Sequence, residues 1–336
     1  MARRSGLALG LLLGSALDAV LADPRTAHPV AAFGEAAARA EQRLWADSRV
    51  RGAWFAAACT GPVVAAAKTA ERLAAHRRAS IAVRDGRAVP GPAGRTRMAG
   101  QLVLTAAAAW AVLGGASLAD EALALASALE AGDLAAARRR LPALCGRDPA
   151  GLGGPELARA AVESVAENTC DAVVAPLAWG AACGLPGLLG YRAVNTLDAM
   201  VGHRTPRYER FGWAAARLDD AANLVPARLT ALLAVVLAPA AGGNARRALR
   251  TLRRDGASHP SPNAGRCEAA FAGALGVRLG GTNVYQGRAE QRGTLGDGRP
   301  ATAADVRRAV RLSRLTGAAA TALAAAAAWA GNREGS

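Results

Sequence analysis

Aromatic residues and lysine are scarce in this chain, and their scarcity excludes one class of protein. Aromatic residues make up 4% of the 336 residues, and Lys68 is the only lysine, so arginine carries nearly all of the positive charge. A nucleic-acid binder needs a basic face interleaved with stacking aromatics, and no stretch of the sequence shows one. We therefore expect no nucleic-acid partner.

Cysteine pairs and the common catalytic motifs are also missing. The five cysteines are scattered without a C-x-x-C pair, which argues against a disulfide framework and against a structural zinc site. Gly61 and Lys68-Thr69 have the wrong spacing for a P-loop, and neither G-x-S-x-G nor H-E-x-x-H occurs. We expect neither zinc nor haem as a cofactor.

Aliphatic residues, above all alanine, are present in excess. Hydrophobic residues make up 52% of the chain before its 38 glycines are added, whereas soluble domains reach roughly 45–50% with glycine included. The net charge is nevertheless +15, so charged and apolar residues must be segregated along the chain. This favours an integral membrane protein over the alternative, a soluble bundle of buried alanine-rich helices.

Six apolar segments approach the ~20 residues that a membrane-crossing helix needs. They lie at about 5–22, 53–67, 99–119, 173–190, 224–241 and 315–330. The predicted fold is all-α: one polytopic membrane domain over residues 1–336, with interfacial helices and Gly/Pro-rich binding loops. The first segment, taken by itself, fits a secretory signal peptide equally well. Both flanks of 224–241 are basic, so the positive-inside rule makes that segment re-entrant or interfacial, or else one crossing is misassigned.

A helix predicted between Pro155 and Pro176 carries the most informative acidic pattern. Glu163, Glu167 and Asp171 recur every four residues, so three mutually repelling carboxylates share one helix face. This pattern predicts an oxygen-ligand site of the magnesium type, which substrate phosphates commonly complete. A solvated helix face would show the same spacing.

The stretch 191–223 and the residues just after it combine cations with carboxylates. Its polar residues are, in order, Arg192, Asn195, Asp198, Arg217, Asp219, Asp220 and Asn223, followed by Arg228. Arginines beside carboxylates suit the clamping of phosphates and the bridging of a metal ion. A charge-paired loop would explain the same residues.

A third cluster has the composition of a binding loop. It comprises His259, Ser261 and Asn263 in a proline-rich turn, then Glu268, and then the glycine-rich run from Gly280 to Tyr285. Prolines fix a turn and glycines permit a close backbone approach to a ligand, although a purely structural turn is the alternative. The residues by themselves therefore indicate a membrane protein with a site for an anionic ligand and a metal.

These blocks together resemble the CobD/CbiB family of cobalamin biosynthesis proteins, in the right order and over nearly the whole chain. The matching blocks are Leu17-Asp18, Asp23-Pro24, His28-Pro29, Gly146-Arg147-Asp148, the runs 163–171 (ESVAENTCD) and 191–198 (YRAVNTLD), Arg217-Leu-Asp219-Asp220 with Asn223, 226–230 (PARLT), 259–265 (HPSPNAG) and 280–285 (GGTNVY). The resemblance implies that the first apolar segment is a retained membrane helix.

The resemblance also implies an activity, that of an adenosylcobinamide-phosphate synthase in the cytoplasmic membrane. Such an enzyme joins aminopropanol, or its phosphate, to a propionate carboxylate of adenosylcobyric acid with the use of ATP. A carboxylate does not condense with an amine at neutral pH unless it is activated, and phosphorylation needs Mg²⁺, arginines and a base. The expected partners are the corrinoid, the aminoalcohol phosphate, the lipid bilayer and other corrinoid-pathway enzymes.

On this hypothesis the site residues fall into three sets. Catalysis is assigned to Glu163, Glu167, Asp219 and Asp220. The metal ligands are Glu167, Asp171 and Asp220. Substrate and phosphate binding is assigned to Arg192, Asn195, Asp198, Arg217, Asn223, Arg228, His259, Ser261, Asn263, Asn283 and Tyr285.

The sequence departs from the family pattern at two places. Cys170 and Ala172 stand where relatives commonly have serine and glycine, and Arg266-Cys267 replaces a usual Trp-Pro pair. We expect altered packing around the site rather than lost activity. The alternative function is a membrane transporter, or a scaffold for corrinoid-pathway enzymes, in which polar residues line a substrate path. Because most motif residues lie in loops and at helix ends, surface chemistry is favoured over a conduit.

Overall fold

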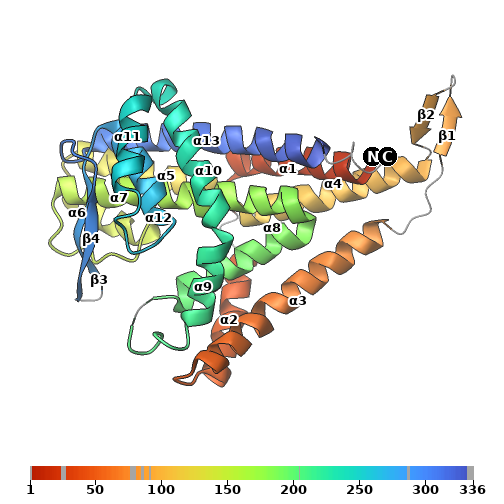
Figure 1. The fold of residues 1–336 in the computed structure, drawn as a ribbon, viewed down its shortest axis with the longest axis horizontal. Coiled ribbons are helices and arrows are strands. Elements are labelled where there is room, and N and C mark those ends of the chain that lie inside the picture. Colours follow the sequence, from red (N-terminus) through yellow and green to blue (C-terminus); the bar gives the residue numbers. More distant parts are fainter. Residues whose placement is uncertain are drawn as a thin grey trace. The chain divides into compact units, whose positions relative to one another are not determined.

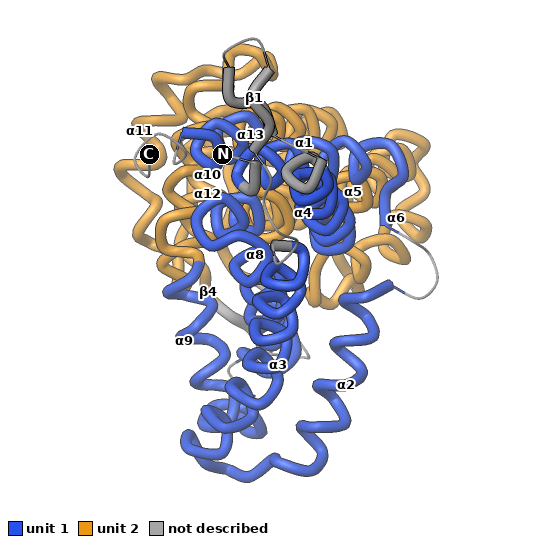
Figure 2. The backbone as a smooth tube through the Cα atoms, turned by 90° about the vertical axis from the view of Figure 1, so that its right-hand side faces the viewer, with its two compact units in different colours: residues 1–113, 175–222, 321–336 blue, residues 114–174, 223–320 orange. Residues whose placement is uncertain are grey.

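A computed structural model describes residues 2–23, 28–75, 81–84, 87–90, 92–203, 205–285 and 288–330, with side chains over 4–23, 28–74, 96–203, 205–282 and 291–330. Helices make up most of this part of the chain, and the strands form two short antiparallel hairpins (Figure 1). The chain forms two compact units (Figure 2). It passes between them at 113/114, 174/175, 222/223 and 320/321, so each unit is built from separate stretches. The single domain predicted over 1–336 stays a prediction.

The first unit contains residues 1–113, 175–222 and 321–336. Its elements are α1 (Ala2–Leu21), α2 (Pro29–Leu44), α3 (Arg49–Ala75), β1 (Ile81–Arg84), β2 (Arg87–Pro90), α4 (Pro92–Val112), α8 (Ala175–Val201) and α9 (Trp213–Ala222). Helix α1 packs closely on α4 because Gly6, Gly10 and Gly14 form one stripe of small residues. A Cβ added at any of them would come within 3 Å of α4. Stripes of small residues at this spacing let membrane helices approach closely.

Helix α8 is interrupted near its middle. Gly184 has φ +69°, and Pro186 follows it without an amide hydrogen. The buried carboxylate of Glu71, on α3, accepts a hydrogen bond from the Leu185 amide at 2.8 Å. A backbone group freed by the break is thus satisfied by a side chain of the same unit.

The second unit contains residues 114–174 and 223–320. Its elements are α5 (Gly115–Glu130), α6 (Leu134–Arg140), the 3-10 turn η1 (Leu141–Ala143), α7 (Gly154–Thr169), the π-helical turn η2 (Cys170–Val174), α10 (Leu224–Leu237), the 3-10 turn η3 (Ala238–Ala241), α11 (Ala245–Asp255), α12 (Ala264–Leu275), β3 (Leu279–Tyr285), β4 (Arg288–Leu295) and the greater part of α13 (Ala303–Ala330). Nearly every residue of α12 is buried, so this helix lies at the centre of the unit.

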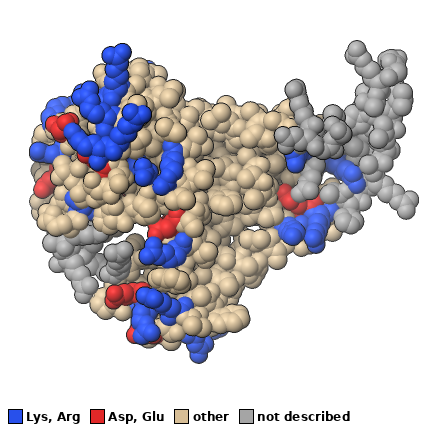
Figure 3. Space-filling view, in the orientation of Figure 1, with Lys and Arg blue, Asp and Glu red and all other residues tan. Residues whose placement is uncertain are grey.

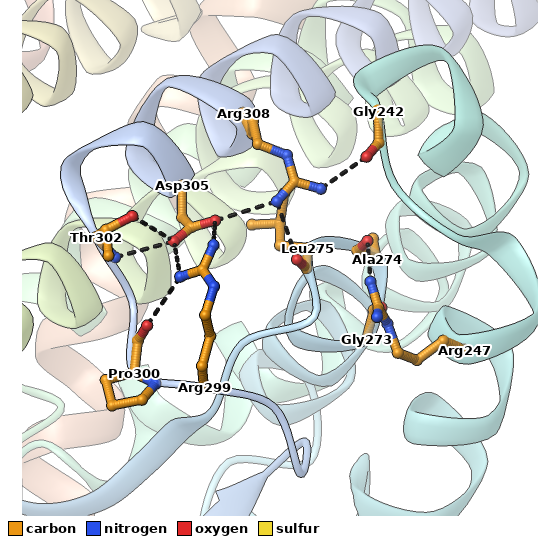
Figure 4. A network of polar contacts seen from close by, with 10 residues as sticks. All are labelled: Gly242, Arg247, Gly273, Ala274, Leu275, Arg299, Pro300, Thr302, Asp305 and Arg308. Atoms are coloured by element: carbon orange, nitrogen blue, oxygen red, sulfur yellow. Dashed lines mark hydrogen bonds and ion pairs between the residues drawn. The ribbon is translucent and has the colours of Figure 1, made fainter.

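Charged side chains secure the end of α12 (Figure 4). Arg247 donates to the carbonyls of Gly273 and Ala274, and Arg308 donates to that of Leu275, so carbonyls left without helical partners are satisfied. Asp305 accepts from Arg308 and, through both oxygens, from Arg299. Burial alone would raise the pKa of Asp305, but its hydrogen bonds from Arg299 and Thr302 outweigh burial and lower it.

Five helical segments of the described chain are long and apolar enough to cross a bilayer, which confirms the all-α polytopic prediction. They are Arg4–Leu21, Arg49–Ala74, Thr96–Glu130, Gly154–Val201 and Leu224–Ala241. The sixth predicted segment, 315–330, lies in α13 and is not among them. Alanine dominates that segment, and alanine adds much less hydropathy than leucine or valine.

Two local predictions were wrong. Gly154 and Pro155 do begin a helix, but helical backbone continues past Pro176 instead of ending there. Since Pro176 has no amide hydrogen, the Ala172 carbonyl loses its usual partner, and it accepts from the Gly114 amide at 3.2 Å instead. The run 280–285, predicted to be a loop, is part of strand β3, which pairs with β4 in antiparallel register. The glycines do not form a turn there; they let the backbone of β3 come close to Arg159 and to β4.

Candidate functional site

A buried ion pair anchors the polar interior of the second unit. Glu163, in the middle of α7, and Arg147, in the preceding loop, are both almost fully buried, and Arg147 Nη2 donates to Glu163 Oε2. The other carboxylate oxygen, Oε1, accepts from the Gly280 amide at 2.7 Å. Both oxygens of Glu163 are thus hydrogen-bonded, and its charge is paired with that of Arg147, which is what a buried carboxylate requires.

A second residue of α7 holds strand β3. Arg159, one turn before Glu163, donates through Nη1 to the Gly280 carbonyl and through Nη2 to the Thr282 carbonyl at 3.3 Å. Beside this contact lies a hollow of about 360 Å³, with the side chains of Arg159 and Arg278 in its wall. The start of β3 is therefore fixed against α7 through both its amide and its carbonyl groups.

The most unusual group of this unit is Glu268, on α12. It is 1% exposed, and neither of its carboxylate oxygens has a hydrogen-bond partner within the described chain. His259 Nε2 lies 3.8 Å from Glu268 Oε1, too far for a hydrogen bond. His259 Nδ1 accepts from the Ser261 amide at 3.0 Å, so the neutral ring carries its proton on Nε2, the atom that faces Glu268.

Burial disfavours the charged form of both of these groups. It raises the pKa of Glu268 well above its usual value, and the nearby charges of Glu163 and Glu167 add to the effect. Burial also lowers the pKa of His259 to about 4, with a further contribution from the charge of Arg292. The site thus places a carboxyl group that resists ionisation beside an imidazole that is neutral at pH 7.

The turn before α12 gathers several residues that the sequence predicted as ligand contacts. Ser261 Oγ accepts from the amides of Asn263 and Ala264 at 3.3 and 3.2 Å, and so caps the start of α12. Arg228, on α10, donates to Asn263 Oδ1 at 3.4 Å. These residues and His259 therefore lie in one polar turn of the second unit.

Three other predicted residues of this unit lie near the turn after α7 or near Glu268, and two more lie in β3. The Cys170 thiol donates to Asn223 Oδ1 at 3.6 Å, which places Asn223 at the π-helical turn after α7. Glu167 is half-buried and close enough for its charge to act on Glu268, and Asp171 is half-buried in η2. The backbones of Asn283 and Tyr285 belong to β3, but their side chains lie outside the described residues.

The remaining predicted residues form a separate group in the first unit. Asn195, on α8, donates to Asp219 Oδ1 at 3.2 Å and accepts from Arg192 Nη1 at 3.4 Å. Arg217 pairs with Asp220 at 3.6 Å on α9, both within reach of solvent. Asp198, on the same helix as Asn195, is half-buried. The predicted site therefore divides between the two units.

The described residues do not assemble a metal site by themselves. No group of three or more His, Cys, Asp or Glu side chains among them is arranged to hold a metal ion. Glu167 and Asp171 belong to the second unit and Asp220 to the first, and both oxygens of Glu163 are already engaged. Magnesium binding by Glu167, Asp171 and Asp220 stays a prediction.

Sequence reasoning gave no role to two residues that the structure makes central. Arg147 stood in a matching block without a role, because nothing local ties it to Glu163. Glu268 was noted only as following the proline-rich turn. Its signal was available, since it is the only acid in the segment 264–275, where every other residue except Arg266 is small or apolar, and acids in such segments are rarely incidental.

Comparison with known proteins agrees with this architecture. The model of the CobD/CbiB protein family matches residues 11–313. "Cobalamin biosynthesis protein CobD" of Mycobacterium tuberculosis (strain ATCC 25618 / H37Rv) is 54% identical over 317 residues, covering 94% of each chain. Proteins of the same name from Geobacter metallireducens and Stutzerimonas stutzeri are 46% and 42% identical, covering 84% and 90% of this chain and 84% and 91% of their own. No solved structure matches.

This multi-pass helical protein, with its buried acid–histidine site, belongs to the CobD/CbiB family. The resemblance read from the sequence blocks is confirmed.

Proposed function

We propose that this protein acts in cobalamin biosynthesis as an adenosylcobinamide-phosphate synthase in the cytoplasmic membrane. It joins aminopropanol, or its phosphate, to a propionate carboxylate of adenosylcobyric acid. Relatives at 54% identity that carry the name of a cobalamin biosynthesis protein support the pathway. The observation that carries the chemistry is the buried, unsatisfied carboxylate of Glu268 beside His259.

Amide formation sets two chemical requirements. The carboxylate must first be activated, and transfer of a phosphoryl group from ATP to one of its oxygens gives an acyl phosphate. The amine nitrogen then attacks the carbonyl carbon, the C–N bond forms, and inorganic phosphate leaves with the acyl oxygen. The nitrogen must lose its protons during this sequence, so a base has to lie where the amine binds.

Glu268 fits the role of that base. An acid whose pKa is raised by burial is a stronger proton acceptor than an ordinary carboxylate, once ionised. When the substrate arrives as an ammonium ion, its charge stabilises the ionised form of Glu268, which then holds the amine and takes its proton. His259 has its Nε2 proton on the side that faces Glu268, and a small approach of the two groups would let it donate to the ionised carboxylate.

The other side chains of the unit have supporting roles. Arg147 and Glu163 fix β3 against α7, and Arg228 with Asn263 offers donors for a phosphate oxygen. Catalysis by Glu167, Asp219 and Asp220 and phosphate binding by Arg192 and Arg217 stay proposals. So do the use of ATP and Mg²⁺ and association with other corrinoid-pathway enzymes.

An assay of the purified protein tests the proposal. Detergent-solubilised protein is incubated with adenosylcobyric acid, aminopropanol phosphate, Mg²⁺ and ATP, and the amide product is measured by mass. Each component is omitted in turn. Glu268→Gln should lose about 10²- to 10⁴-fold in turnover, the usual range for a general acid–base group. Glu209→Gln, at an exposed acid of the first unit, serves as the matched control and should keep full activity.

Two results would contradict this function. Folded wild-type protein that forms no amide with the complete mixture would refute the synthase assignment. Proteoliposomes that accumulate unmodified adenosylcobyric acid would favour the transporter instead.

A further inference from the structure

Helix α11 follows directly after a segment that is long and apolar enough to cross a membrane. The apolar segment Leu224–Ala241 ends four residues before α11 begins at Ala245. Four residues span at most about 14 Å when fully extended. The actual link is tighter, because Gly242 has φ +71° and the Gly243 amide bonds back to the Ala238 carbonyl at 2.8 Å. The first turn of α11 therefore lies close to the membrane boundary.

One face of α11 is buried and the opposite face is a row of arginines. Ala248, Thr251 and Leu252 lie in the interior of the second unit, where Gly273 of α12 is close to Ala248 and Thr251. Arg246, Arg250 and Arg253 recur at helical spacing on the exposed side. In Figure 3, basic side chains gather over α11.

The arginines of this exposed row lack the close partners that their neighbours have among the described residues, although the charge of Arg250 contributes to lowering the pKa of the Asp297 carboxyl. Arg247 is engaged by carbonyls of α12, and Arg254 pairs with Asp255 and Asp297. Arg246, Arg250 and Arg253 make no hydrogen bond or ion pair with the described residues. Together with Leu249 and Arg254 they line an open hollow of about 550 Å³. Like charges on adjacent turns repel, so an anion in this hollow would relieve them.

We propose that the arginine face of α11, formed by Arg246, Arg250 and Arg253, is a binding site for the phosphate headgroup of an anionic phospholipid. A lipid is the occupant that the position favours, because the site is joined by a short link to a membrane-crossing segment. Arginine forks match phosphate oxygens in paired geometry. Half-buried Leu249 offers the hollow an apolar wall for the glycerol backbone.

Lipid titration followed by native mass spectrometry tests this site on the full-length protein in detergent. Binding of phosphatidylglycerol is compared with that of phosphatidylcholine for wild type and for the triple variant R246Q/R250Q/R253Q. Near an anionic surface each basic residue contributes about a five-fold factor, so the triple variant should weaken phosphatidylglycerol binding by on the order of 100-fold. Phosphatidylcholine binding should not change.

Two matched variants separate this site from general charge. R139Q/R311Q/R314Q removes three exposed arginines of the same unit outside α11 and should bind phosphatidylglycerol like wild type. R246K/R250K/R253K keeps the charge and should bind within a few-fold of wild type, which also guards against loss caused by misfolding.

Three outcomes would overturn the proposal. They are equal losses in both glutamine triples, no loss in the α11 triple, and displacement of phosphatidylglycerol by millimolar glycerol phosphate. The last would mean that the site takes a water-soluble phosphate.

Discussion

The buried Arg147–Glu163 pair offers a test of what Glu163 does. Glu163→Gln keeps an oxygen to accept from the Gly280 amide but leaves the guanidinium of Arg147 buried without its counter-charge. Arg147→Met removes one of the two donors to the carboxylate of Glu163 and leaves only the Gly280 amide. Breaking a buried ion pair by removing one partner typically costs about 3–5 kcal/mol.

That free energy converts into a measurable change in melting temperature. With roughly 2–4 °C per kcal/mol for a domain of this size, each single variant should melt roughly 6–20 °C below wild type in detergent. The double variant Arg147→Met/Glu163→Gln leaves neither charge behind, so it should recover at least half of the loss. Thermal unfolding of all four proteins gives the coupling free energy.

Turnover measured on the same four proteins separates a structural role from a catalytic one. If the double variant regains stability and activity together, Glu163 positions β3. If it regains stability alone, Glu163 takes part in the chemistry, as the sequence pattern predicted. A Glu163→Gln variant that melts like wild type, or single losses that simply add in the double variant, would show that the two side chains are not coupled as a buried ion pair.

Three further predictions concern stability. The raised pKa of Glu268 means that the folded state holds a proton which the unfolded chain releases above about pH 4.5, so the stability of the wild type falls as pH rises. Glu268→Gln lacks this titration. Its free energy of unfolding, measured in denaturant titrations, should gain about 1.4 kcal/mol over wild type per pH unit above 4.5, up to the folded-state pKa. Because the pKa of His259 is lowered to about 4, its contribution to the stability of the folded state is complete above pH 6.5 and falls by up to about 3 kcal/mol by pH 4. His259→Gln should lack this loss. Equal stability profiles of the variant and the wild type in acid would contradict the prediction. Asn244→Ala removes the side chain that accepts from the Arg247 amide at 2.9 Å, and should cost about 0.5–2 kcal/mol; an unchanged melting temperature would exclude this capping role.

Much of the fold follows from hydropathy and helix-terminus signals. All six apolar segments lie in helical structure, and five of them are apolar enough to cross a bilayer, because leucine, valine and alanine runs of that length have few other stable solutions in lipid. The helix was predicted to end at Pro176, but it continues because a distant amide, that of Gly114, donates to the Ala172 carbonyl in place of the amide that proline lacks. Strand β3 was missed because its glycines are typical of loops, and only its pairing with β4 makes it extended.

The site was predictable in its residue types but less so in its pairings. The motif residues His259, Ser261 and Asn263 do lie in one polar turn. The partner of Glu163 is sixteen residues away, and the charge that acts on Glu268 comes from another helix, so no local spacing encodes either contact. Charge periodicity identifies acids on a helix face, whereas burial determines which of them stay neutral.

The hydrogen bond between the Gly114 amide and the Ala172 carbonyl also bears on how this protein can be altered. A helix normally satisfies its backbone carbonyls with its own amides, but here one carbonyl accepts from an amide almost sixty positions earlier in the chain. Lengthening the junction between α4 and α5 would withdraw that donor and leave a peptide oxygen stranded in a low-dielectric interior. A fusion tag or loop graft inserted between α4 and α5 would therefore disturb the helical turn at Ala172, although the insertion itself does not touch that turn.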